Sequence, residues 1–365
     1  MSHRCWLLAI ALFVGVPSWS AAQAPDFRVV VVSESADIVT WLKPSANGLV
    51  VDRVVPVGTM PSDIDGPHNV AMAPDGKSYY ITVAHGTPFG SLWKLNSSTD
   101  SLLGRVQVEL FPTTISMTPD GQYAFVANSD FYGDHPRTNF VSVIHAPTMR
   151  KIADIPACDM PHGVKVNHAG NRVYVSCMHS DEILELEVST LTVSRRAGTG
   201  SRHSMSSDDA CSPTFVSVSP DDKRLYVACN HGNTLQVWDA TTLHRMQEIK
   251  VGKGAYNVEP SPDAKLVLVT NKKEQSVSLI DATRLTEVAR LPTSKTMVHG
   301  IAYSPDASRA YISCESVGVD PGAVDVIDLT AHKRIASIAV PGQPTGITTV
   351  TLRSPERRES PAHGL

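Results

Sequence analysis

The chain has 365 residues, of which 42% are hydrophobic and 19% are charged, and it contains 25 Pro and 23 Gly. This composition is typical of a folded chain rich in turns and excludes a mainly disordered or coiled-coil protein. Its formal net charge is -4, from 32 Lys and Arg against 36 Asp and Glu. Because no basic field exists to attract phosphates, no nucleic-acid partner is expected.

The N-terminus has the pattern of a secretory signal peptide. Residues 1–4 carry one positive charge, residues 5–16 are largely apolar, and the small residues at 20–22 provide a cleavage site. The alternative, a membrane anchor, needs about 20 apolar residues, whereas Pro17 interrupts this run. We therefore predict a signal peptide over residues 1–22, a periplasmic or secreted location and no membrane span.

Six segments that follow repeat one pattern. Each has an alternating strand, a turn similar to Pro-Asp-Gly and a second strand that ends in Tyr-Val or an equivalent, as in FVSVSPDDKRLYVACNHG from Phe215. The turns begin 42 to 52 residues apart, at Pro74, Pro119, His168, Pro220, Pro262 and Pro305. Two further strands follow each pair. Because this period is that of a propeller blade, we predict blades of four antiparallel strands.

The two ends of the repeat region complete each other. Residues 28–58 supply three strands without a preceding first strand, and residues 343–352 supply a first strand without followers. Together they form a seventh blade, which leaves no free sheet edge. We predict an all-β, seven-bladed β-propeller over residues 23–352, present as a monomer. The polar, Pro-containing residues 353–365 are predicted to be a disordered tail.

Five cysteines remain after the signal peptide, and four of them form two matched pairs. Cys158 and Cys177 lie 19 residues apart in one blade, and Cys211 and Cys229 lie 18 residues apart in the next. An exported chain folds in an oxidising compartment, so we predict one disulfide within each pair. The alternatives are a bridge between Cys158 and Cys211, and metal ligation by thiolates.

Histidines recur at two positions of the repeat that face the same mouth of the ring. One is six residues before each turn and the other eleven residues after it. Histidine fills six of these twelve places, far more than random placement of the 14 histidines of the chain would give. The inner column contains His68, His162 and His299, and the outer column contains His85, His179 and His231. Neutral imidazole is a common ligand of copper, zinc and iron, so these six are the predicted metal ligands. The alternative is that repeat duplication copied a rim histidine without any ligand.

The repeats resemble those of the YVTN family of seven-bladed β-propellers. The resemblance covers residues 28–352 and rests on TPDGQYAFVAN (118–128), SPDDKRLYVACN (219–230) and SPDAKLVLVTN (261–271). It implies the fold, whereas the activities of that family and its relatives are diverse and include cell-surface binding, lactone hydrolysis and copper or haem chemistry. In position only, the rim histidines are similar to those of the nitrous oxide reductases and thiocyanate dehydrogenases, which are copper propellers.

The sequence therefore predicts an exported propeller that binds a ligand, foremost a transition metal such as copper, on its histidine-rich face. The partner is a small ligand or a protein. No Cys-x-x-Cys-His site or nucleotide-binding Gly motif is present, so neither covalent haem nor a nucleotide is expected. The alternatives are a copper-dependent periplasmic oxidoreductase, a metal-free interaction scaffold, and a lactonase-like hydrolase in which histidines and carboxylates such as Asp130, Asp134 and Glu315 activate water.

Overall fold

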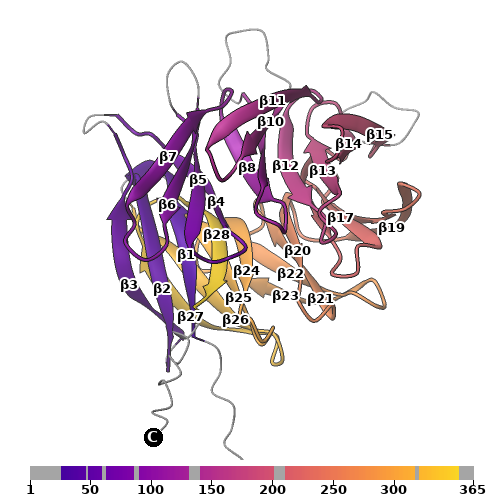
Figure 1. Ribbon diagram of the computed structural model, residues 1–365. Coiled ribbons are helices and arrows are strands. Elements are labelled where there is room, and N and C mark those ends of the chain that lie inside the picture. Colours follow the sequence, from indigo (N-terminus) through magenta and orange to yellow (C-terminus); the bar gives the residue numbers. More distant parts are fainter. Residues whose placement is uncertain are drawn as a thin grey trace, which may run out of the picture.

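The computed structural model describes residues 26–46, 48–59, 63–85, 90–130, 140–200, 210–316 and 320–352. Within these ranges, 28 strands form seven antiparallel sheets of four strands, arranged as blades around one axis (Figure 1). The predicted seven-bladed all-β fold is confirmed. The predicted signal peptide and tail lie outside the described residues, as does Asp134. No helix in the described ranges is long and apolar enough to cross a membrane.

Six blades are each built from four consecutive strands, with the innermost strand first. The first three blades are β4 (Pro67–Met72), β5 (Ser78–Val83), β6 (Ser91–Asn96) and β7 (Leu102–Gln107); β8 (Pro112–Met117), β9 (Tyr123–Asn128), β10 (Phe140–His145) and β11 (Arg150–Pro156); and β12 (Pro161–Val166), β13 (Arg172–Cys177), β14 (Glu182–Glu187) and β15 (Thr192–Gly198). The next three are β16 (Pro213–Val218), β17 (Arg224–Cys229), β18 (Thr234–Asp239) and β19 (His244–Lys250); β20 (Ala255–Pro260), β21 (Leu266–Asn271), β22 (Ser276–Asp281) and β23 (Thr286–Pro292); and β24 (Met297–Tyr303), β25 (Arg309–Glu315), β26 (Gly322–Asp328) and β27 (Lys333–Val340).

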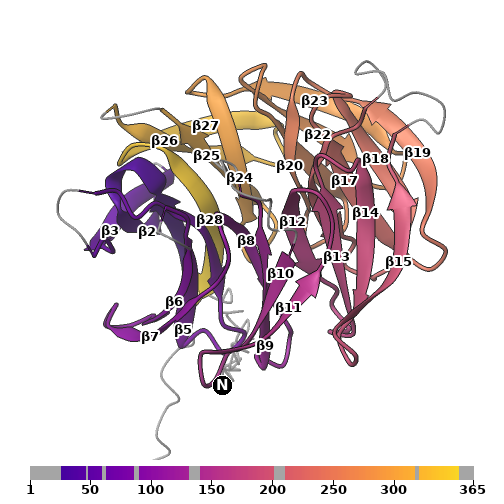
Figure 2. The same cartoon turned by 90° about the horizontal axis from the view of Figure 1, so that it is seen from above.

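The seventh blade joins the two ends of the described chain. Its order is β28 (Pro344–Thr351), β1 (Phe27–Ser33), β2 (Ile38–Ser45) and β3 (Gly48–Pro56), and the short 3-10 helix η1 (Glu34–Ala36) connects β1 to β2. β1 and β28 pair antiparallel, from Phe27 opposite Thr351 to Ser33 opposite Pro344. The blades follow the chain around the ring, so that the indigo and yellow strands meet (Figures 1 and 2). The predicted seventh blade is thereby confirmed.

Burial changes with the distance of a strand from the axis. The second strand of the first blade, β5, is buried at all six residues, because neighbouring blades cover both of its faces. The outermost strand β15 instead alternates between exposed and half-buried residues. The apolar clusters lie between neighbouring blades. One of them combines Phe215 and Tyr226 of the fourth blade with Val267 and Val269 of the fifth. Packing between blades, rather than a single central core, therefore stabilises the ring.

The Ser/Thr-Pro-Asp turns of the repeat have a specific hydrogen-bond pattern. In the fifth blade, the Ser261 hydroxyl donates to Asp263 Oδ1 over 2.7 Å and accepts a bond from the backbone N–H of Leu266 over 2.9 Å. Thr118, Ser219 and Ser304 make the same bond to the Asp two residues later. In the third blade, where Asn167 precedes His168, the Asn167 side-chain oxygen instead accepts bonds from two backbone N–H groups. This turn therefore stays closed although it has Asn167-His168 in place of the Ser-Pro or Thr-Pro of those four turns.

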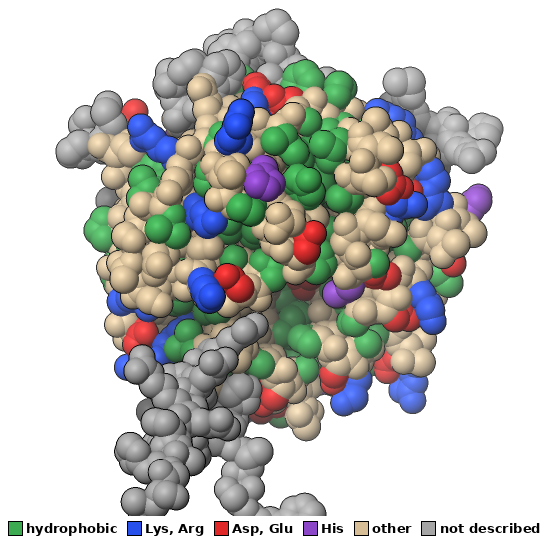
Figure 3. All heavy atoms as spheres, in the orientation of Figure 1, with side chains coloured by type: hydrophobic (Ala, Val, Ile, Leu, Met, Phe, Trp, Pro, Cys, Tyr) green, Lys and Arg blue, Asp and Glu red, His purple; other side chains and the backbone are tan. Residues whose placement is uncertain are grey.

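Both predicted disulfides are present. Cys158 is bonded to Cys177 and Cys211 to Cys229, each within its own blade. Among the described cysteines, Cys314 is free and buried. On the face shown in Figure 3, basic and acidic side chains of the described residues are interspersed, as expected from the nearly balanced charge of the sequence.

The last turn position of the repeat generates a stability prediction. Gly76, Gly121 and Gly170 have positive φ there, but Ala264 occupies the same position at φ +58°. Because a left-handed conformation strains an L-residue, we expect Ala264→Gly to raise the free energy of unfolding by about 0.5–1 kcal/mol, after allowing for the larger entropy of Gly in the unfolded chain.

Urea denaturation of the two proteins provides the measurement. Ala289→Gly within strand β23 is the matched control, and it should lower the free energy of unfolding by about 0.5–1 kcal/mol. A loss of stability on Ala264→Gly would contradict the turn assignment.

Candidate functional site

The inner column lies at a distortion that recurs in every blade. The pairing register between the innermost and second strands shifts at the inner-column residue in all seven blades. Such bulges re-orient a side chain out of the regular pleat. The residues at the shift are His68, Thr113, His162, Thr214, Tyr256, His299 and Thr345. All seven are buried at this mouth of the ring.

The inner-column rings lie in contact around the axis. The ring centroids of His68 and His299 are 5.3 Å apart, and those of His299 and Tyr256 are 4.7 Å apart. The Tyr256 hydroxyl lies 3.2 Å from His162 Nε2, and His162 Nδ1 lies 2.8 Å from the carbonyl oxygen of Thr214. The carbonyl oxygen only accepts, so His162 donates a hydrogen bond from Nδ1 and accepts one from the Tyr256 hydroxyl at Nε2. The structure therefore brings the three inner-column histidines together through Tyr256.

A cavity of about 410 Å³ opens at this mouth. Besides His68, His299 and Tyr256, its lining includes Glu34 and Lys273, and the side chains that directly precede four of the positions eleven residues after a turn: Met178, Asn230, Lys272 and Glu315. Of the outer column, His85 contacts Glu34 of this lining, whereas His179 and His231 lie outside it. The His179 side chain is 43% exposed, 4.0 Å from Asp159, and His231 is exposed on the rim. Because successive residues of an extended segment point to opposite sides, Met178 and Asn230, which directly precede His179 and His231, face the cavity instead.

Glu34 is a functional candidate that the repeat pattern did not reveal. Its carboxylate lies 2.6 Å from His68 Nδ1 and 2.9 Å from His85 Nε2. Burial opposes the ionised form, but these hydrogen bonds and the imidazole charges outweigh it and lower the pKa of Glu34 to about 2. The bond to Glu34 and, secondarily, its charge raise the pKa of His85. Because the carboxylate only accepts hydrogen bonds, His68 carries its proton on Nδ1.

Three imidazole nitrogens at the cavity have no hydrogen-bond partner. They are His68 Nε2 and both ring nitrogens of His299, and all three are buried. Burial, with smaller effects from Lys272 and the neighbouring histidines, holds the pKa of His299 well below its usual range. Burial, with smaller effects from His68 and Lys272, lowers the pKa of His162 to about 3 despite its hydrogen bond to the Thr214 carbonyl. Both rings are therefore neutral at pH 7.

Charged groups flank the aromatic cluster on its other side. Lys272 Nζ lies 2.8 Å from Glu315 Oε1 and 4.3 Å from the centre of the Tyr256 ring. Burial and the two carboxylates of Glu315 and Glu34 raise the pKa of Tyr256 well above its usual value. The mouth thus combines neutral imidazoles and a protonated phenol with balanced charges at its margin. In the described ranges, no three His, Cys, Asp or Glu side chains are grouped so as to hold a metal ion.

The contact between Glu34 and His85 generates a second prediction. Substituting Glu34→Gln and His85→Ala separately and together, in protein treated with a chelator, should show a coupling energy of about 1–2 kcal/mol, at the lower end for a hydrogen bond to a charged group because the His85 side chain is 29% exposed. Urea unfolding at pH 6 gives the four stabilities. A coupling energy near zero would mean that this contact adds nothing to stability.

Comparison with known proteins agrees with the fold. A family model described as a YNCE-like beta-propeller matches residues 5–355. No curated protein sequence matches the chain. Among solved structures, the periplasmic gluconolactonase PpgL of Pseudomonas aeruginosa superposes with a TM-score of 0.73 and 17% identity, over 89% of this chain and 99% of that chain.

Two further structures are similar over most of the chain. Hydrazine synthase of Kuenenia stuttgartiensis has a TM-score of 0.63 and 20% identity, over 79% of this chain and 90% of its own. The dihydro-heme d1 dehydrogenase NirN in complex with DHE has a TM-score of 0.58 and 16% identity, over 92% of this chain and 77% of its own. At these identities the likeness establishes the propeller fold alone.

Proposed function

The chain belongs to the YNCE-like β-propeller family, and we propose that it is an exported protein whose histidine-lined mouth binds a copper ion through His68 and His299. The observation that carries this proposal is the set of buried imidazole nitrogens without a partner on these two residues. A buried polar atom without a hydrogen bond is costly. Neutral imidazole nitrogen is the commonest protein ligand of metal ions, so a bound metal ion would occupy such nitrogens.

The surroundings of His68 support this role. Its Nδ1 proton is held by the Glu34 carboxylate, which leaves the lone pair of Nε2 for a ligand. A carboxylate behind a metal-binding histidine fixes its tautomer and increases its basicity. His299 is 1% exposed and neutral, so one of its two ring nitrogens also has a lone pair available.

The other donors favour copper over zinc or magnesium. Met178 and Met297 line the same cavity as the two histidines. Thioether sulfur is a soft ligand that selects Cu(I), whereas Mg²⁺ prefers oxygen. A copper ion bound by two imidazoles would keep further coordination positions for thioethers, solvent or a small ligand. If the copper-loaded protein oxidised or reduced a bound substrate, the protein would be the copper-dependent oxidoreductase that the sequence analysis gives as an alternative.

Export is part of the proposal. The two disulfides support folding in an oxidising compartment. The signal-like residues 1–22 support passage across a membrane. Together they favour a periplasmic or secreted location.

Metal titration tests the site. The chelated chain, titrated with Cu(I) under anaerobic conditions, should bind one copper, and His68→Ala and His299→Ala should each abolish stoichiometric binding. Glu34→Gln should weaken binding by about 10–100-fold, since it removes the group that orients His68. The exposed His244 on β19 provides the matched control, and His244→Ala should bind as the wild type does.

The same titration also tests whether His179 and His231 of the outer column contribute to copper binding. His179→Ala and His231→Ala should leave copper affinity unchanged, because both side chains lie outside the cavity lining. A wild-type chain that binds no copper would overturn the proposal in favour of the metal-free interaction scaffold.

A lactonase-like hydrolase is the second candidate function. The specific observation is the buried pair of His68 and Glu34, in which His68 Nε2 is available as a general base at a 410 Å³ cavity. The structural likeness to a gluconolactonase adds support at the level of fold. If this function holds, the chelated chain should hydrolyse δ-gluconolactone and His68→Ala should abolish the activity. Hydrolysis that persists in His68→Ala would exclude this role.

A further inference from the structure

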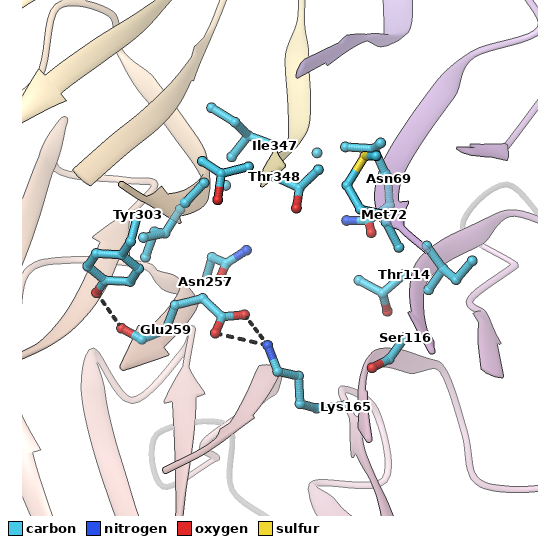
Figure 4. A pocket seen from close by; sticks show the side chains of 18 of the residues that line it. Asn69, Met72, Thr114, Ser116, Lys165, Asn257, Glu259, Tyr303, Ile347 and Thr348 are labelled. Atoms are coloured by element: carbon cyan, nitrogen blue, oxygen red, sulfur yellow. Dashed lines mark hydrogen bonds and ion pairs between the residues drawn. The ribbon is translucent and has the colours of Figure 1, made fainter. Parts of the chain in front are cut away.

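The opposite mouth of the ring has a larger cavity of different chemistry. It measures about 730 Å³ and is lined by residues from the seven innermost strands and from the repeat turns, including Pro74, Pro220, Pro262 and Pro305. Its lining contains His168 of a repeat turn but none of the histidines of the inner and outer columns. Its size falls within the range of small-molecule sites. Figure 4 shows the polar side chains that surround it.

An ion pair spans part of this cavity. Lys165 Nζ on β12 lies 2.8 and 3.0 Å from the two carboxylate oxygens of Glu259 on β20. β16 lies between these strands in the ring, and its Ser217 hydroxyl donates to Glu259 Oε2 over 2.8 Å. The Lys165 and Glu259 side chains are 30% and 27% exposed. Both partners therefore remain accessible from the cavity, and their charges cancel.

Asn257 supplies an independent indication of a ligand. It is 7% exposed, lines the cavity, and its side-chain oxygen Oδ1 is buried without a hydrogen-bond partner. Figure 4 places its side chain beside Glu259 and facing the open space. An unpaired buried acceptor costs about 1–3 kcal/mol, so a ligand that donates a hydrogen bond to it would be stabilised.

These groups together define the class of ligand. The ligand has to donate to Asn257 Oδ1 while it accepts from Lys165 or donates to Glu259. A hydroxyl group both donates and accepts, whereas a ligand with net charge would be attracted by one member of the ion pair and repelled by the other, and so gains little from its charge. Met72 and Ile347 add apolar surface to the same cavity. We propose that this mouth binds a neutral polyhydroxylated molecule, a sugar of one or two rings.

Titration of the full chain with D-glucose and maltose tests the proposal. Binding followed by saturation-transfer NMR should be detected for at least one of these sugars, and Asn257→Leu should weaken it about tenfold, the effect of one hydrogen bond of about 1.4 kcal/mol. His244→Ala is the surface control and should bind as the wild type does. A chelator should have no effect on sugar binding, which separates this outcome from that of the copper site.

Folding of the variant is checked in the same samples. Because Asn257→Leu removes an unpaired buried oxygen, its melting temperature should equal or exceed that of the wild type. The absence of sugar binding by the wild type would overturn the proposal. So would sugar binding that Asn257→Leu leaves intact, or binding of the zwitterion L-serine in place of either sugar.

Discussion

The antiparallel pairing of β28 with β1 is the interaction on which the rest of the structure depends. It joins the two ends of the described chain into one blade and closes the ring. Closure fixes the radius at which all seven innermost strands start, and so determines how near their first residues come to the axis. The rings of His68, His299 and Tyr256 are in contact because of this constraint. No local propensity of these residues would bring them together, since each belongs to a different blade.

The periodic features of the molecule could be predicted from the sequence. Alternating strands and turns such as those at Pro220 and Pro262 recur with the period of a blade. The similar spacing of the cysteines in two neighbouring blades predicted both disulfides. The inner histidine column could be placed at one mouth for the same reason. Glu34 was missed because the seventh blade has no turn of the repeat type, so its loop could not be aligned with the others. The exposure of His179 and His231 follows from a one-residue difference in side-chain direction, which loop spacing does not specify.

The two mouths differ because the repeat keeps the backbone and varies the side chains. At one mouth, desolvation keeps His162 and His299 neutral, and the charged residues of the lining are Glu34, Lys273 and the pair of Lys272 and Glu315. At the other, the ion pair of Lys165 and Glu259 lies within the cavity. A neutral imidazole cluster favours soft and borderline cations, whereas a balanced pair with hydroxyl neighbours favours neutral polar molecules. One closed scaffold thus presents two unrelated environments.

Cys314 occupies in the sixth blade the position that Cys177 and Cys229 hold in the third and fourth, at the end of the second strand. The cysteines that pair with those two have no counterpart before β24, so the thiol stays reduced. Burial raises the pKa of this thiol well above its usual value, and a protonated thiol without solvent access does not exchange with disulfides. In an oxidising medium, Cys314 of the folded chain is therefore inert toward mixed-disulfide formation. Reaction of Cys314 with a thiol reagent would occur only when β25 separates from its neighbours, so this single atom acts as an internal reporter of blade opening.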